Sequence, residues 1–144
     1  MIDFVNVEHV NQPTSISWVQ SRDGYIKANA GQYGYYRVMY PESNWAALSQ
    51  ALLTAGQNQL DFPLSSVDRA GLINDAFSLA RAGLLNYTTA LDLTRFLVYE
   101  RDYVVWTAAF DAFRFIQNRL IYEPIYGKFA AYVRSLFDSG YMTR

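Results

Sequence analysis

Residues 65–83 read SSVDRAGLINDAFSLARAG, and this stretch carries the clearest secondary-structure signal in the chain. Ser65 and Asp68 have the spacing of a capping box, which opens helices. Arg81 and Gly83 stand where the last turn and the end of such a helix are expected. The apolar residues at helical spacing between these ends are Ile73, Ala76, Phe77 and Ala80. The stretch therefore predicts an amphipathic helix that runs from the capping box to Arg81.

Helical spacing recurs on both sides of this stretch. Upstream, Trp45, Leu48 and Leu52 form one stripe, which Ser43 is placed to cap and Gly56 to end. Three more helices are expected downstream, around Leu91–Val98, over about Val104–Tyr122, and from Pro124 towards the end of the chain. Short loops between such helices favour antiparallel packing, either as a bundle or as a solenoid of helical hairpins.

Before Pro41 the apolar period changes to the period of two that is typical of strands. Ile16–Ser21 and Tyr25–Asn29 favour strands and are separated by an Asp-Gly pair, which is a hairpin signal. Tyr35–Tyr40 alternates in the same way and predicts a third strand. Three short strands cannot bury their apolar side alone, so we expect the edge of a larger sheet. The predicted fold class is α+β, with edge strands followed by antiparallel helices.

The amino-acid composition excludes several classes of function. The chain has 144 residues and 16.5 kDa, is 51% hydrophobic, and has a formal charge of -1, which leaves no positive field for nucleic acid. Its longest apolar run, Tyr103–Phe110, is too short for a bilayer span, so we expect no membrane contact from this segment. Without cysteine, and with His9 as the single histidine, a thiolate or two-histidine metal site cannot form. We expect His9 to face solvent.

Two stretches resemble a known family. Residues 26–38, IKANAGQYGYYRV, are similar to a strand-loop-strand near the end of the small β domain of the M1 zinc aminopeptidases, a group that includes aminopeptidase N and the endoplasmic reticulum aminopeptidases. Residues 68–83, DRAGLINDAFSLARAG, resemble the signature that opens their C-terminal helical domain. Residues 90–93, ALDL, then Glu100 and Trp106, follow in the expected order, and the resemblance covers about residues 18–137.

The resemblance implies a fragment of a zinc-dependent hydrolase that removes N-terminal residues from peptides. Residues 1–41 would be the last strands of a truncated β-sandwich domain, and residues 42–144 the first part of the helical domain. The family's HExxH, GxMEN and transition-state tyrosine belong to an upstream domain, and none of these motifs occurs here. We therefore expect no catalytic residue, metal ligand or cofactor in this chain, with zinc held elsewhere in the parent. The helices would wall the substrate chamber, with the rest of the parent chain and the peptide substrate as partners.

Several residues are candidates for particular roles. Asp68, Arg69 and Asp75 belong to the signature, and we expect a structural role for them, with Arg69 and Asp75 in buried ion pairs to neighbouring strands. Asp68 and Asp75 share a helix face, but helix capping explains Asp68 better than general acid-base chemistry does. Arg114 and Arg119 are candidate contacts for the C-terminal carboxylate of a peptide, against the alternative of solvated or structural side chains. Residues 31–34, GQYG, are interpreted as a backbone bend, not as a phosphate loop.

Two questions stay open at this level. Asn86-Tyr87-Thr88 is a glycosylation sequon in a predicted loop, which favours a parent of the secretory pathway or of the extracellular face of the plasma membrane, with a cytoplasmic location as the alternative. An alternative function is a stand-alone helical module that binds a protein and has no enzymatic activity. An incomplete sheet and helices that are apolar on two faces predict that the isolated chain self-associates.

Overall fold

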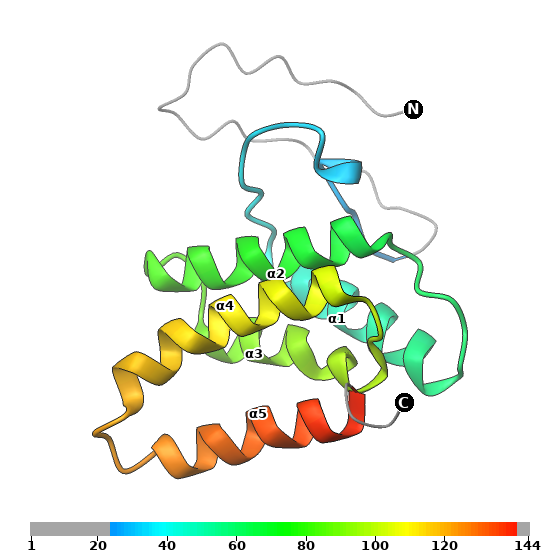
Figure 1. Ribbon diagram of the computed structural model, residues 1–144. Helices are drawn as coiled ribbons and strands as arrows, with labels where there is room; N and C mark the ends of the chain where they lie inside the picture. The colour runs from blue at the N-terminus through cyan, green and yellow to red at the C-terminus, as the bar shows by residue number, and fades with distance from the viewer. Residues whose placement is uncertain (1–23, 141–144) are drawn as a thin grey trace.

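The computed structural model describes residues 24–140, and α-helices dominate that part of the chain (Figure 1). In chain order the elements are η1 (Ala30–Gln32), α1 (Glu42–Gln57), α2 (Ser66–Arg81), α3 (Tyr87–Leu93), η2 (Thr94–Tyr99), α4 (Tyr103–Leu120) and α5 (Tyr126–Gly140), where η marks a 3-10 helix. Helices are therefore present where they are expected after position 41, but the third is a short α-helix that continues as a 3-10 helix after Leu93, and the last begins at Tyr126, after Pro124. No helix between residues 24 and 140 is long and apolar enough to cross a bilayer.

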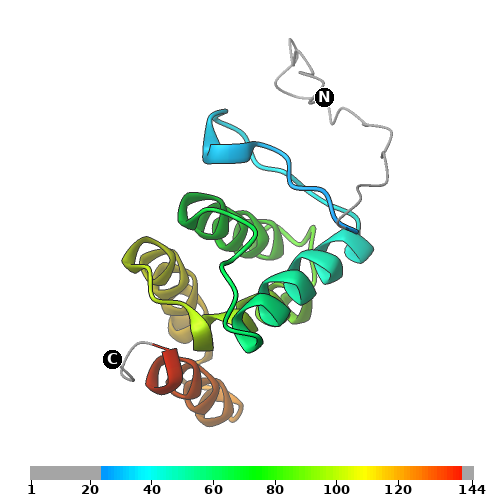
Figure 2. The same cartoon turned by 90° about the vertical axis from the view of Figure 1, so that its right-hand side faces the viewer.

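Alternate helices pack together. α1 lies against α3 and η2, α2 lies against α4, and α5 lies against η2 and more lightly against α4 (Figures 1 and 2). Packing of α1 on α3 and of α2 on α4, together with contacts between the neighbours α2 and α3 and between α4 and α5, is typical of a solenoid of helical hairpins. Of the two arrangements that the sequence leaves open, the structure thus favours the solenoid.

The ends of α2 form as the sequence predicts. The Ser65 hydroxyl accepts a hydrogen bond of 3.2 Å from the backbone N–H of Asp68, and Gly83 has a φ of 77° just after the helix. The predicted cap of α1 is wrong, because Pro41 occupies the cap position and Ser43 lies inside the helix. α1 also continues past Gly56, where the bare backbone allows the Tyr99 ring to approach closely.

The prediction of an α+β fold is wrong for the described residues, which contain no strand between positions 24 and 140. Residues 25–28 and 37–40 have no regular secondary structure, and Asn29 and residues 34–36 lie in bends. Side chains bond several backbone groups of this segment where a sheet would use another strand. The Asn44 side chain accepts a hydrogen bond from the N–H of Ile26 and donates one to its carbonyl, at 2.7 and 2.8 Å. The Tyr40 hydroxyl accepts from the N–H of Ala28 at 2.8 Å. The first expected strand, Ile16–Ser21, lies outside the described residues.

The core joins all five α-helices and both tryptophans that lie in them. Its largest fully buried apolar side chains come from α1, α2, α3, η2 and α4: Trp45, Leu48, Leu52, Leu72, Ile73, Leu93, Phe96, Leu97, Val105 and Trp106. Edge-to-face contacts join Phe77 of α2 to Phe113 of α4, and Tyr40 to Trp45, with ring centroids 6.0 and 5.0 Å apart. The core places α2 at the centre of the described fold, between α4 and the segment 24–41.

Candidate functional site

α2 turns three buried charged side chains towards other parts of the chain. These are Asp68, Arg69 and Asp75, the residues that the sequence singled out as a signature. Asp68 and Asp75 face residues 24–41, which we call the N-terminal arm, while Arg69 faces the junction between η2 and α4. A buried charge is costly unless it is paired and hydrogen-bonded, so the partners of these groups define the site.

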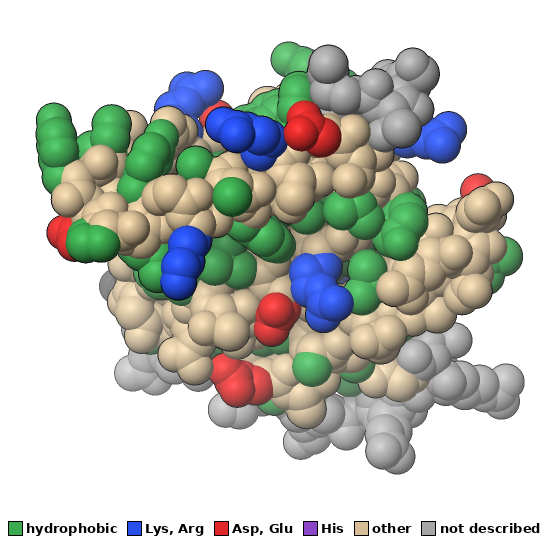
Figure 3. Space-filling view, turned by 90° about the horizontal axis from the view of Figure 1, so that it is seen from below, with side chains coloured by type: hydrophobic (Ala, Val, Ile, Leu, Met, Phe, Trp, Pro, Cys, Tyr) green, Lys and Arg blue, Asp and Glu red, His purple; other side chains and the backbone are tan. Residues whose placement is uncertain are grey.

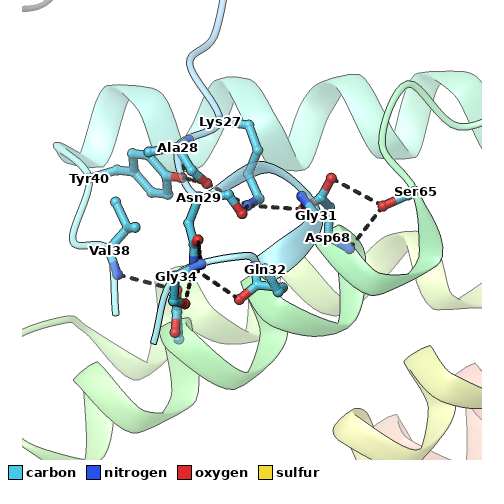
Figure 4. A network of polar contacts seen from close by, with 11 residues as sticks. Lys27, Ala28, Asn29, Gly31, Gln32, Gly34, Val38, Tyr40, Ser65 and Asp68 are labelled. Atoms are coloured by element: carbon cyan, nitrogen blue, oxygen red, sulfur yellow. Dashed lines mark hydrogen bonds and ion pairs between the residues drawn. The ribbon is translucent and has the colours of Figure 1, made fainter. Parts of the chain in front are cut away.

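Asp68 fixes the first half of the arm. Its carboxylate accepts a hydrogen bond of 2.8 Å from the N–H of Gly31 and one of 3.1 Å from the Ser65 hydroxyl (Figure 4). It also pairs with Lys27, whose Nζ lies 3.3 Å away and donates to the Ala28 carbonyl at 2.6 Å. One carboxylate thus holds the arm and the start of α2 together.

The side-chain amide of Asn29 holds the bend between the two halves of the arm. Asn29 has a φ of 53°, accepts from the N–H of Gly34 at 2.7 Å and donates to the Gly34 carbonyl at 3.0 Å (Figure 4). Gly71 of α2 has no side chain, so the Gln32 side chain lies directly against the helix at that position. The predicted backbone bend at residues 31–34 is confirmed, whereas the flanking strands are not.

Asp75 fixes the second half of the arm. Its carboxylate accepts from the N–H of Val38 at 3.3 Å and lies 3.4 Å from the Arg37 guanidinium. Burial raises the pKa of this carboxyl above its ordinary value, and the Val38 N–H and the cations Arg37 and Lys27 oppose that shift only in part. Asp75 therefore contacts the arm as expected, although the arm is not a strand there.

Arg69 and Glu100 form a buried, bidentate ion pair. Arg69 Nε donates to one carboxylate oxygen at 2.7 Å and Nη2 to the other at 3.0 Å, while Nη1 donates to the Leu64 carbonyl at 2.6 Å. Glu100 also accepts from the N–H groups of Arg101 and Asp102, both at 2.9 Å. The indole of Trp106 donates to the Glu100 carbonyl at 3.1 Å. The expected buried ion pair of Arg69 is present, but its expected partner on a neighbouring strand is wrong. Arg69 pairs with Glu100, 31 residues away at the junction between η2 and α4.

The candidate arginines of α4 do not converge. Arg114 and Arg119 are both exposed, and five residues of α-helix turn them about 140° apart. The Arg119 guanidinium lies 5.0 Å from the Phe115 ring centroid, and Arg81 of α2 lies 4.1 Å from the same centroid. Arg81 was not predicted as a site residue, because only the packing of α2 on α4 brings it there.

Two further features lie on the surface. Asn86 is exposed at the start of α3, makes no cap bond, and its amide lies 3.4 Å from Glu42 Oε1.

An open groove of about 450 Å³ lies between α4 and α5 and is lined mainly by aromatic and aliphatic side chains: Phe110, Phe113, Gln117, Tyr126, Phe129, Ala130, Val133, Arg134 and Phe137. Seen from below, the molecule exposes hydrophobic side chains between a few charged ones (Figure 3).

No group of three or more His, Asp or Glu side chains within residues 24–140 could hold a metal ion. The carboxylates of Asp68, Asp75 and Glu100 are all engaged by neighbouring groups of the chain, so the arrangement holds the fold together and offers no open coordination position. His9 lies outside the described residues.

Comparison with known proteins identifies relatives that are much longer. Residues 25–143 match the family model described as ERAP1-like C-terminal domain. The glutamyl aminopeptidase of Bitis rhinoceros is 41% identical over 115 residues, which are 79% of this chain and 12% of that protein. The aminopeptidase N of Plutella xylostella is 38% identical over 122 residues, 85% of this chain and 12% of that protein. The glutamyl aminopeptidase of Rattus norvegicus is 38% identical over 124 residues, 83% of this chain and 13% of that protein. The resemblance to M1 aminopeptidases is confirmed, and the chain belongs to the family of ERAP1-like C-terminal domains.

Proposed function

We propose that this chain is the non-catalytic, architectural part of an M1 zinc aminopeptidase that removes N-terminal residues from peptides. The family match and the names of the relatives support an aminopeptidase as the parent. The chain spans only 12% of the length of the first relatives, which supports its being one part of a longer protein. In the parent, ligands outside this chain would hold the zinc, and the zinc would activate the attacking water. The division into a sandwich end at 1–41 and a helical domain at 42–144 stays a prediction, and the family match begins at residue 25.

The observation that carries the architectural role is the Arg69–Glu100 pair. Its donors and acceptors are used within the chain, on Leu64 and on the backbone of residues 101 and 102. Such a pair fixes the angle between α2 and α4 and leaves no group for chemistry. The helices would then wall the substrate chamber of the parent, where Arg119, and less readily Arg114, would face the carboxylate of a bound peptide.

The test is capture of the native protein with an antibody against this chain, followed by peptide sequencing. We expect a product several times larger than 16.5 kDa that contains HExxH and GxMEN peptides. A native product of 16.5 kDa would overturn the proposal. The purified chain should release no fluorophore from glutamyl or alanyl substrates, and release that requires zinc would contradict its non-catalytic role.

A stand-alone binding module is the second candidate, and the groove between α4 and α5 favours it. The same groove supports self-association of the isolated chain, since exposed apolar surface promotes it. Sedimentation at high concentration decides this point, because a clean monomer contradicts self-association. A monomer with a protein ligand, together with a native product of 16.5 kDa, would support the module.

Exposure of Asn86 at the start of α3 supports use of the sequon in a parent of the secretory pathway. Enzymatic removal of N-glycans should lower the mass of the peptide that carries Asn86 in the captured native protein. An unmodified peptide in all copies would contradict glycosylation and leave the cytoplasmic alternative.

A further inference from the structure

Both walls of the groove between α4 and α5 follow a helical repeat. α4 contributes Phe110, Phe113 and Gln117, which are three and four positions apart. α5 contributes side chains at helical spacing along its length, namely Tyr126, Phe129, Ala130, Val133, Arg134 and Phe137. Residues three and four apart share one face of a helix, so the groove runs along the two helices and not across them.

The groove suits a helix and not an extended peptide. Arg134 is the single charged residue among the nine described residues that line it, and the amide of Gln117 already donates to the Tyr126 hydroxyl at 3.2 Å. An extended peptide would leave most of its N–H and C=O groups against apolar walls, where each unpaired group is costly. A helix satisfies these groups internally and presents side chains to the walls.

The packing order of the helices indicates which helix belongs there. α3 lies on α1, α4 lies on α2 and α5 lies on η2, so each of these elements is covered by one that follows it (Figures 1 and 2). α4 has no such cover within residues 24–140, because α5, which lies beside it, is the last helix described there. A repeat that ends a solenoid carries a polar outer face, which the apolar groove does not provide.

We propose that the groove between α4 and α5 seats an amphipathic helix of the parent chain that continues the solenoid after α5. Since this helix belongs to the same parent, the inference rests on the proposed function. The helix would turn apolar residues at positions i, i+3, i+4 and i+7 towards Phe113, Phe129 and Val133. Arg134 has no ion pair among residues 24–140, so a carboxylate at the edge of the helix would complement its charge.

The experiment compares the 144-residue chain with a chain extended by the residues that follow Arg144 in the transcript, up to the end of the next predicted helical hairpin. Native-state hydrogen exchange follows the amides around Ala130 and Val133 of α5. We expect these amides to exchange at least tenfold more slowly in the extended chain, because the docked helix closes the open side of α5. Unchanged exchange would overturn the inference and leave the proposed function standing, whereas a transcript that ends at Arg144 would overturn both.

Two adjacent alanines of α5 provide a matched pair of variants. Ala130 lines the groove, whereas Ala131 is exposed and does not line it. In the extended chain, Ala130→Glu should restore the faster exchange of α5, because the docked helix would bury the new carboxylate. Ala131→Glu should leave the exchange slow. In the 144-residue chain neither variant should change the exchange of α5, since the open groove leaves the new side chain in water. Equal loss of protection in the two extended variants would overturn the inference.

Protein concentration separates this helix from a second copy of the chain. Protection by a helix of the same chain should not depend on concentration, and the extended chain should self-associate less than the 144-residue chain in sedimentation. Protection of α5 that increases with concentration in both chains alike would assign the groove to a second copy and overturn the inference.

Discussion

α2 and α5 have nearly the same length, 16 and 15 residues, but the fold uses them in opposite ways. α2 is engaged on two sides: apolar residues face α4, and Asp68, Arg69 and Asp75 are buried against the arm and the η2–α4 junction. In α5 only Leu136 and Gly140 are buried, and the groove beside α4 stays open. The comparison shows that charged residues inside a helix can hold distant segments, whereas an amphipathic helix alone does not secure close packing.

Arg69→Met should have the largest effect on this contrast. The substitution removes the cation that pairs with Glu100, whose side chain is only 2% exposed. An unpaired buried carboxylate should lower the free energy of unfolding by about 3–5 kcal/mol. Urea denaturation measures the change. Adding Glu100→Gln removes the charge but keeps an acceptor for residues 101 and 102, so the double variant should be more stable than Arg69→Met alone. A double variant that is no more stable would contradict a cost that arises from the unpaired charge.

Gly140→Ala should show where α5 is held most tightly. An added Cβ would collide with the carbonyl of Leu97 and approach the Trp106 ring to 2.8 Å, so we expect a loss of about 1–3 kcal/mol in the free energy of unfolding. Gly127→Ala, in the first turn of the same helix, meets nothing within 4 Å and should stabilise the chain by about 0.5–1 kcal/mol. Similar effects at both positions in thermal unfolding would show that the end of α5 does not pack against η2.

Asp75 should make stability depend on pH. Because burial raises its folded pKa above the ordinary 3.8, the folded state binds the proton more readily than the unfolded state. The stabilisation from protonation is complete below the unfolded pKa and is lost as pH rises through the folded pKa. The stability of the chain relative to Asp75→Asn should therefore fall as pH rises above about 4. A difference that grows with pH in urea titrations would mean that Arg37 and Lys27 outweigh burial.

Arg37→Ala should have the smallest effect. The Arg37 side chain is 50% exposed, and exposed ion pairs contribute about 0.2–1 kcal/mol to stability. Chemical denaturation in low and high salt should show a small loss that salt reduces further. A loss comparable to that of Arg69→Met would contradict the distinction between the buried and the exposed pair.

The helical half of the fold could be predicted because its signals are local. Ser65, Arg81 and Gly83 lie within one stretch and mark both ends of α2. The arm could not be predicted in the same way. Its alternation suggests a strand, but Val38 is bound by a carboxylate 37 residues away and Ile26 by an amide 18 residues away. Local periodicity contains no information about such partners.

In the candidate site, too, the sequence identifies individual residues but not the partners that the packing brings to them. Arg69 could be singled out from its place in the signature, whereas Glu100 as its partner depends on how the η2–α4 junction returns to α2. Arg81 and Phe115 meet only because α2 packs on α4. The sequence therefore indicates which residues matter in α2 but not which groups they contact.

Native-state hydrogen exchange of the 144-residue chain tests the contrast between α2 and α5 most directly. Amides in the middle of α2, around Leu72 and Ala76, should exchange only through global unfolding, because both sides of the helix are engaged. Amides in the middle of α5, around Ala130 and Val133, should exchange at least tenfold faster through local opening. Equal protection of the two helices would contradict the account, because α5 would then be as firmly part of the fold as α2.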